Sequence, residues 1–211
     1  MKLRVAKKPA DSYQHGDLRE ALIDAGLKLL SEGGVERLSL RAAAQLAGVS
    51  HTAPYRHYRD KEALVAAIAE RGFRLLTVSM QSELARSHAQ RAPDKVLALG
   101  LGYIGFGTAH PAYLQLIFGG VLSKQNPPAE LQAAGSEAYL TLRTAVADGI
   151  TAGELRSGNA DELALACWSL VHGLAMLIIN GAVQRPSSKQ AERELGTRLL
   201  GLLGAGIFPV S

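Results

Sequence analysis

Hydrophobic positions recur with helical spacing along most of this chain. In the stretch DLREALIDAGLKLLSEGG, apolar residues fall at i, i+4, i+7 and i+11 on one face of a helix: Leu18, Leu22, Ala25 and Leu29. Gly33 and Gly34 follow, and glycines favour the left-handed conformation that ends helices. The pattern predicts a first helix with one face in a core.

Three further helices are predicted before residue 77. Ser39 is a good N-cap for LRAAAQLAG, which Gly48 would end. Ser50 is expected to cap a short third helix that begins near His51. Asp60 is expected to cap KEALVAAIAERGFRLL, with an apolar stripe of Leu64, Val65, Ile68 and Leu75.

The remaining chain also favours helices, at about 94–109, 111–118, 128–152, 160–184 and 188–207. No stretch alternates with strand period, so the fold class is predicted to be all-α. We expect a first domain over 1–60, a connecting helix over 61–92 and a second helical domain over 93–211.

The composition is that of an ordinary globular protein, with 47% hydrophobic and 20% charged residues in 211. Cys167 is the single cysteine, which excludes an intrachain disulfide and a cysteine-based zinc cage. Its pairing with His172 as a nucleophile is disfavoured, because positions five apart diverge around a helix. We therefore expect no cofactor, no metal site and no catalytic residues.

Positive charge is concentrated in the first third of the chain. Residues 1–61 hold 11 Lys and Arg against 7 Asp and Glu, whereas 62–211 hold 12 of each sign. The arm with Lys2, Arg4, Lys7 and Lys8 has no apolar segment after it, so we expect no secretory signal. The excess indicates where a polyanion would bind. A basic solubilising tail is the alternative.

Two long uncharged runs, Val96–Ser123 and Leu163–Gln184, are long enough to cross a bilayer. The first contains Pro111 and many glycines, and the second carries Ser169, His172 and Asn180, which are costly in lipid. Buried helices of a bundle are therefore expected, and membrane insertion is the disfavoured alternative.

The stretch GVSHTAPYRHYRDKEAL gathers aromatic, imidazole and basic side chains behind a capped helix. Two short helices joined by a glycine turn are typical of a helix-turn-helix motif. We expect Ser50, His51, Thr52, Tyr55 and Arg56 to point outward, where they can donate to phosphate oxygens or to base edges. A solvated aromatic and basic turn is the alternative.

These residues resemble the N-terminal DNA-binding region of the tetracycline-repressor (TetR) family over about residues 17–70. The matches are Gly34, Ser39, Ala43, Ala47, Gly48, Val49, Ser50, Tyr55, His57, Tyr58, Lys61, Glu62 and Leu64. The resemblance implies a dimeric, ligand-responsive DNA-binding regulator, usually a repressor. It implies that 1–60 is a basic arm and helix-turn-helix DNA-binding domain, with the motif at about 39–58, and that 93–211 is an effector-binding and dimerisation domain. The candidate DNA contacts are Ser39, Arg41, Ser50, His51, Thr52, Tyr55, Arg56, His57 and Lys61.

The second half of the chain offers aromatic candidates for a pocket. An apolar small-molecule site needs ring surfaces and a few polar groups, which these residues supply: Tyr103, Phe106, His110, Tyr113, Phe118, Trp168 and His172. An ordinary core is the alternative. The Trp168-x-x-x-His172-Gly173 pattern resembles the C-terminal domain of one TetR subgroup that is named for those three residues.

The stretch GLGYIG, from Gly100 to Gly105, has the G-x-G-x-x-G sequence of the dinucleotide-binding fingerprint. However, no acidic residue follows before Glu130 that could hold a ribose. We expect these glycines to allow close helix packing instead. The leading prediction is a cytoplasmic, homodimeric, non-enzymatic repressor that binds double-stranded operator DNA and a small-molecule effector. A small helical enzyme or lipid carrier without DNA binding is the alternative.

Overall fold

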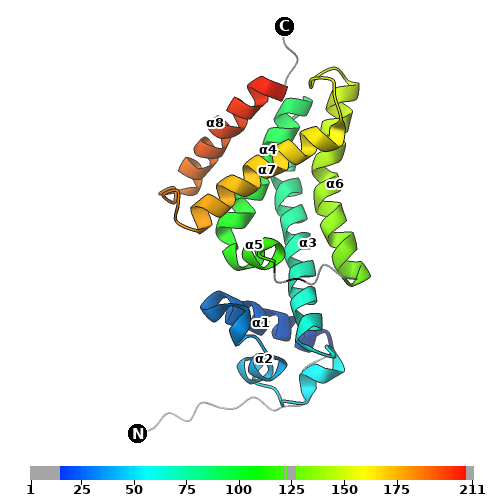
Figure 1. Cartoon of the computed structure of the whole chain (residues 1–211), viewed down its shortest axis with the longest axis vertical. Helices are drawn as coiled ribbons and strands as arrows, with labels where there is room; N and C mark the ends of the chain where they lie inside the picture. The colour runs from blue at the N-terminus through cyan, green and yellow to red at the C-terminus, as the bar shows by residue number, and fades with distance from the viewer. Residues whose placement is uncertain (1–14, 121, 123–126, 208–211) are drawn as a thin grey trace. The chain divides into compact units, whose positions relative to one another are not determined.

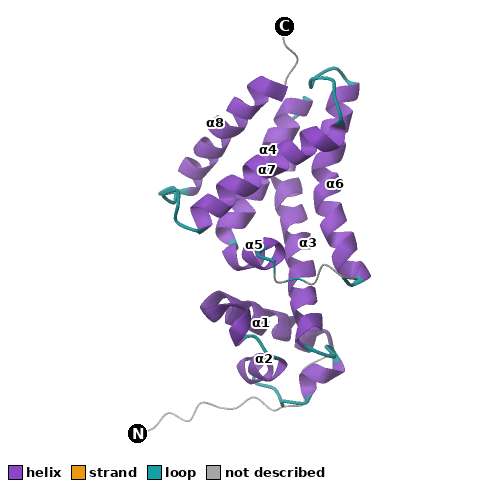
Figure 2. Ribbon diagram, viewed as in Figure 1, coloured by secondary structure: helices purple, strands orange, loops and turns teal. Residues whose placement is uncertain are grey.

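The computed structural model describes residues 15–120, 122 and 127–207. These residues form helices and the loops between them, with no strand in the described ranges (Figure 2). The predicted all-α fold is confirmed. The basic arm lies outside the described residues. The chain divides into two compact units, Met1–Ile68 and Ala69–Ser211, and their boundary falls within one helix.

The first unit contains α1 (His15–Arg37), α2 (Leu40–Ala47), the 3-10 helix η1 (Ala53–Arg56) and the first residues of α3 (Lys61–Ser87) (Figure 1). The predicted stop near Gly33 and Gly34 is a kink, where both residues leave helical geometry and Gly34 takes a φ of 70°. The core of the first unit is built from apolar side chains of the four elements and of the loops between them, namely Leu22, Leu38, Ala43, Pro54, Tyr58, Leu64 and Ile68.

The predicted caps of α2 are confirmed. The Ser39 hydroxyl accepts a hydrogen bond from the Ala42 amide at 3.1 Å. Gly48 takes the left-handed conformation, with a φ of 73°, and its N–H donates to the carbonyls of the last helical turn. Side chains other than glycine strain at this φ, so the turn that follows α2 depends on this residue.

The predicted third helix beginning near His51 is wrong. The chain forms only the four-residue η1, which begins at Ala53, and Ser50 does not cap it. The Ser50 hydroxyl lies 3.2 Å from the Thr52 hydroxyl instead. Pro54 has no N–H to donate to the carbonyl four residues earlier, and the amides of Ala53 and His57 bond three residues back. The proline therefore favours the tighter 3-10 turn.

The second unit is built around α4 (Ala92–Ala109), which is buried along most of its length and packs against the end of α3 and against the four helices that follow it (Figure 1). These are α5 (Pro111–Phe118), α6 (Ala129–Thr151), α7 (Ala160–Ile179) and α8 (Lys189–Ile207). Helix α7 also packs against α6 and α8. The nearly charge-free sequence of α4 is thus that of a central core helix.

The glycines of GLGYIG lie within α4, as close-packing positions. A Cβ atom built on Gly102 would lie 2.6 Å from the Cα of Met80 and 2.8 Å from the carbonyl oxygen of Ser79. The Ser79 hydroxyl donates to the Gly102 carbonyl at 2.9 Å. Helices α3 and α4 therefore touch backbone to backbone at this point.

Two details of the predicted helices differ from the structure. The sequence pattern predicts Leu75 on the buried stripe of α3, but Leu75 is 39% exposed and Leu76 is fully buried, since Leu76 continues the face of Ile68. Helix α7 ends at Ile179 and not near residue 184, because Gly181 takes a φ of 74° and turns the chain.

Helix α7 is long and apolar enough to cross a membrane by length and composition, with a mean hydropathy of 1.8. It is the one helix of the described residues that meets these criteria. In the structure it packs against α4, α6 and α8, which is the environment expected of a core helix in a bundle.

Candidate functional site

The turn from α2 to η1 presents an exposed polar surface, which we call the reader face. Its side chains come from the N-cap and first turn of α2, from the turn after Gly48 and from η1. They are Ser39, Arg41, Ser50, His51, Thr52, Tyr55 and Arg56, and all of them are exposed. Tyr55 is 53% exposed although it is a large aromatic residue. The surface offers two guanidinium groups, an imidazole and four hydroxyls to a partner.

The same segment is anchored by residues that face inward. Pro54 and Tyr58 are buried, and the Pro54 carbonyl accepts from the amides of His57 and Tyr58, each at 2.9 Å. The Tyr58 hydroxyl lies 3.5 Å from the Arg19 carbonyl of α1. Within η1 the buried Pro54 precedes two exposed residues, Tyr55 and Arg56, so the anchored turn holds these polar side chains at a fixed place.

Two predicted DNA contacts, His57 and Lys61, are only half-exposed. The Lys61 ammonium donates to the Val35 carbonyl at 2.6 Å, which ties the start of α3 to the end of α1. An ammonium group has three donors, so two remain for a phosphate. Asp60 caps α3 as predicted, since its carboxylate accepts from the Ala63 amide at 2.8 Å.

The second unit brings four of the predicted pocket residues into one cluster. The Tyr103 hydroxyl and the His172 Nδ1 atom lie 2.9 Å apart. The Tyr103 and Trp168 rings have centroids 5.0 Å apart, and those of Phe118 and His172 are 4.7 Å apart. Burial lowers the pKa of His172 and raises that of Tyr103, so burial favours the neutral form of both groups.

The other three predicted residues form a second ring cluster. Phe106 stacks with Tyr113 at a centroid distance of 6.3 Å, and the His110 ring lies 5.3 Å from that of Phe106. The Arg71 guanidinium donates to the Tyr113 hydroxyl at 2.6 Å and lies over its ring. A cation from α3 is therefore bound to this cluster, although no sequence pattern links Arg71 to these rings.

These rings are closely packed in the structure. The cavity beside Tyr103 and Trp168 holds about 10 Å³, which is room for about one water molecule. Tyr103, Phe106 and Tyr113 are buried, whereas Phe118 is 37% exposed. A ligand of ordinary size would enter here only if the side chains moved.

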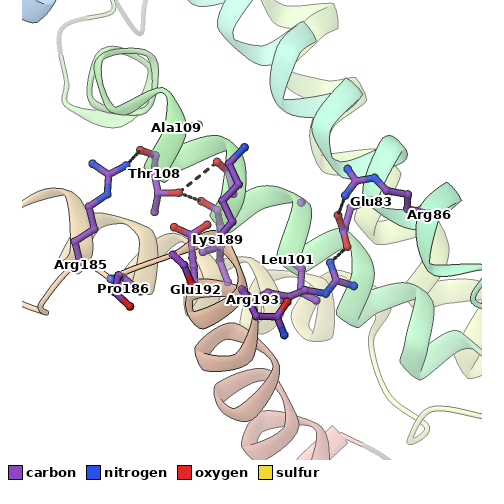
Figure 3. A pocket seen from close by; sticks show the side chains of 16 residues that line it. Glu83, Arg86, Leu101, Thr108, Ala109, Arg185, Pro186, Lys189, Glu192 and Arg193 are labelled. Carbon is purple, nitrogen blue, oxygen red and sulfur yellow. Dashed lines mark hydrogen bonds and ion pairs between the residues drawn. The ribbon is translucent and has the colours of Figure 1, made fainter.

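A larger cavity, of about 550 Å³, was not foreseen from the sequence. It lies among α3, α4, the α7–α8 loop and the first turns of α8, and it is lined by polar and charged side chains (Figure 3). Its sequence signal is the run RPSSK, where Arg185 and Lys189 flank two serines after a long apolar helix.

Cys167 is buried, and burial raises the pKa of its thiol to about 11, so the reactive thiolate is disfavoured. Among the described residues, no group of three His, Cys, Asp or Glu side chains is placed to hold a metal ion.

Comparison with known families gives matches over both units. Residues 22–68 match the family model of bacterial regulatory proteins of the tetR family. Residues 96–201 match the model of the tetracyclin repressor-like C-terminal domain. The first match contains the whole reader face, and the second contains both ring clusters.

Two tetracycline repressors of Escherichia coli are similar to the N-terminal part. The class D protein is 43% identical over 51 residues, 24% of this chain and 23% of the repressor. The class C protein is 44% identical over 52 residues, 25% of this chain and 24% of the repressor. The match thus spans about a quarter of the length of these curated relatives.

Solved structures resemble the chain over most of its length. A Rhodococcus sp. RHA1 protein of unknown function has a TM-score of 0.81 and 30% identity, and the match covers 94% of this chain and all of that one. The TetR-family regulator PfmR of Thermus thermophilus has a TM-score of 0.67 and 19% identity, covering 87% and 97% of the two chains. FadR of Bacillus subtilis, solved in complex with stearoyl-CoA, has a TM-score of 0.69 and 16% identity, covering 89% and 98%.

Proposed function

The chain belongs to the TetR family of bacterial transcriptional regulators, and from this premise we propose that it represses transcription by binding a palindromic operator and leaves it when a small effector binds. The observation that carries the proposal is the reader face. Its seven exposed polar side chains lie next to buried anchors, within the segment that matches the family's DNA-binding region.

Different residues of the DNA-binding unit would contact the DNA backbone and the base edges. Arg41 and Lys61 lie at helix starts, where a cation and free backbone amides favour phosphate. His51 and Thr52 are exposed in the turn that leads into η1 and are our candidates for base-edge contacts. This division supports a protein that both binds DNA strongly and distinguishes sequences.

The effector would be uncharged or weakly polar and would bind among the two ring clusters. The segment Val96–Ser123 has no Lys, Arg, Asp or Glu, so it offers no full countercharge of its own to a strongly ionic ligand. The Arg71 guanidinium, which lies at the second cluster, is already bonded to the Tyr113 hydroxyl. Because the clusters are packed, a ligand would have to displace rings, and it would favour a different arrangement of the unit. The stearoyl-CoA complex of FadR supports an effector role for this fold.

A homodimer through α7 and α8 would supply the second reader face of a palindromic site. Exposed leucines on the two helices support this contact: Leu165, Leu177 and Leu202 are 58%, 48% and 73% exposed. A regulator of this kind works in the cytoplasm and needs no enzymatic activity. Family membership favours it over a small helical enzyme or a lipid carrier, the alternatives that the sequence leaves open.

The test is to recover genomic DNA fragments that the purified protein retains, and to select binding sites from random duplex DNA. We expect a palindromic consensus, and His51→Ala or Thr52→Ala should relax particular positions by about 1–3 kcal/mol each. Ser31→Ala, an exposed change on α1, is the control and should keep the parent consensus. Retention of no specific fragment, or an unchanged consensus in both reader variants, would contradict the proposed readout.

Effector coupling is tested by the affinity of a ligand with and without operator DNA. By reciprocity the operator must weaken an inducer by the factor by which the inducer weakens operator binding, and a tenfold factor is about 1.4 kcal/mol. A compound that binds equally well in both states is not the effector.

A further inference from the structure

We propose that the cavity of about 550 Å³ beside the start of α8 is a second small-molecule site, distinct from the ring clusters, and that it takes a compact amphiphilic anion (Figure 3). The ligand would carry a carboxylate or a phosphate group on a small apolar body. None of the seven residues proposed for the effector lines this cavity.

The size and lining of the cavity fit a small organic molecule. Its volume falls within the roughly 300–1,000 Å³ of ordinary ligand sites. Apolar side chains from α4 and the α7–α8 loop form part of its wall, namely Leu101, Ile104, Ala109 and Pro186. Gly105 adds no side chain to the α4 side of the cavity. A Cβ atom at this position would meet only the Glu192 carboxylate, at 4.0 Å.

The charged side chains give the cavity a positive balance. Four basic residues line it, Arg86, Arg185, Lys189 and Arg193, against two acidic ones, Glu83 and Glu192. The Glu83 carboxylate is buried and already bound by two of the cations, by Arg86 at 2.8 Å and by Arg193 (Figure 3). These three charges form a wall that links α3 to α8. The other charged residues of the lining are two basic ones, Arg185 and Lys189, and one acidic one, Glu192.

Arg185 is oriented and has donors to spare. Its Nη2 atom donates to the Thr108 carbonyl at 3.0 Å, which fixes the guanidinium at the end of α4 (Figure 3). A guanidinium has five N–H donors in a planar fork that matches a carboxylate or phosphate. One carbonyl bond therefore leaves donors that can meet an oxyanion at the rim of the cavity.

Lys189 supplies the second cation. It is the first residue of α8, and Ser188, which also lines the cavity, caps the helix by accepting from the Ala191 amide at 3.1 Å. In the part of the chain that the structure describes, neither Lys189 nor Glu192 forms an ion pair. An anion bound here would be attracted by the two cations, Arg185 and Lys189, and repelled by the Glu192 carboxylate. The site should therefore bind an anion more tightly than a neutral molecule of the same shape.

Titration calorimetry on the full chain tests the site with probes that differ in charge alone. Benzoate should bind in the millimolar range, and benzamide, its neutral isostere, should bind more weakly by at least about two- to fivefold, the range for an exposed ion pair. Added salt should narrow this difference. Phenyl phosphate and inorganic phosphate separate an amphiphile site from a bare anion site, and we expect phenyl phosphate to bind more tightly.

The variants carry opposite expected signs, which a general loss of folding would not reproduce. Lys189→Gln should weaken benzoate by about two- to fivefold, and Glu192→Gln should strengthen it by a similar factor. Lys28→Gln, an exposed change on α1, removes the same charge elsewhere and is the matched control. The proposal is overturned if benzoate does not bind, if benzamide binds as well, if inorganic phosphate equals phenyl phosphate, or if Lys189→Gln behaves like Lys28→Gln. None of these results bears on operator binding, which is measured separately.

Discussion

Side chains in the first unit have two roles, contact with a partner and support of the fold, and their burial distinguishes the two. Arg41 and His51 are exposed and free to meet a partner, whereas Tyr58 is buried and holds the turn in place. Lys61 combines both kinds, since its ammonium is bonded to the Val35 carbonyl and retains two donors. Substitution of such a residue must therefore be read with a measure of stability beside the measure of binding.

Arg41→Ala and Lys61→Ala should both weaken all DNA sites to a similar degree. Each would remove one of the proposed phosphate contacts, so the slope of log K against log salt should fall by about one unit. Lys61→Ala should also lower stability by about 1.5 kcal/mol, because a charge-assisted hydrogen bond is lost. Arg41→Ala should leave the melting temperature unchanged. A preferred sequence that shifts while the salt slope stays constant would reassign these residues to base readout.

The pH dependence of stability should contain a component from His172. Burial lowers its pKa below the ordinary 6.5 in the folded protein, so the unfolded chain binds the proton more readily. Its contribution to stability is complete above about pH 6.5 and is lost as the pH falls toward the folded pKa. Denaturant unfolding between about pH 8 and pH 5 should show this loss in the parent and less of it in His172→Gln. His51→Gln, at an exposed position, is the control, and equal behaviour of the two variants would exclude the effect.

At the scale of elements, close backbone approach and turn geometry decide where helices begin, end and cross. Gly48 ends α2 with a left-handed turn, and Pro54 keeps η1 to a single 3-10 turn. Gly102 lets α3 and α4 meet at their backbones near Ser79 and Met80. Each of these residues acts through its backbone, so substitution should change geometry as well as contacts.

Two glycines of α4 should respond with opposite signs to alanine. In Gly102→Ala the new Cβ overlaps the backbone of α3, which cannot move without separating the helices, so a loss of about 1–3 kcal/mol is expected. Gly105→Ala meets only the Glu192 carboxylate at 4.0 Å and should gain up to about 1 kcal/mol from helix propensity. Urea unfolding of both variants compares the two sites within one helix. If the two variants were equally stable, the contact between α3 and α4 at Gly102 would not be as close as the structure indicates.

For the molecule as a whole, the composition of α7 and α8 bears on assembly. Helix α7 has apolar residues on nearly all sides, and its own unit covers only some of them. A Cβ atom at Gly173 would meet nothing within 4 Å, and Leu177 on the same side is 48% exposed. A second copy that covers this side would remove the apolar surface from water and would supply the two-fold symmetry that a palindromic operator requires.

Leu177→Glu should therefore convert a dimer into a monomer at micromolar concentration, because the contact between copies would bury an unpaired charge. Its affinity for a palindromic operator should fall with it, while binding to a half-site should remain. Leu140→Glu, a similarly exposed leucine on α6 (49%), is the control and should stay dimeric. Sedimentation velocity measures both, and a parent protein that sediments as a monomer while it binds palindromic DNA would contradict the proposed interface.

The sequence alone determined the all-α fold, most helix boundaries and the family. Apolar spacing, Ser39 and Asp60 as caps, and Gly48 as a stop are local signals, and local hydrogen bonds decide such features. The predicted third helix near His51 is wrong. The structure has the 3-10 helix η1 there, because Pro54 favours this tighter turn. The choice of Leu75 over Leu76 failed because both are apolar, and only packing shows which one faces the core.

The tertiary structure decided which side chains meet. The sequence named the aromatic residues, but only the fold pairs Tyr103 with His172, 69 positions apart, and separates them from the Phe106 cluster. The charged cavity needed Glu83 of α3 and Arg193 of α8, 110 positions apart, to lie together. Periodicity reports the face of a helix on which a residue lies. It does not report which other helix that face will meet, because the packing of distant segments fixes that choice.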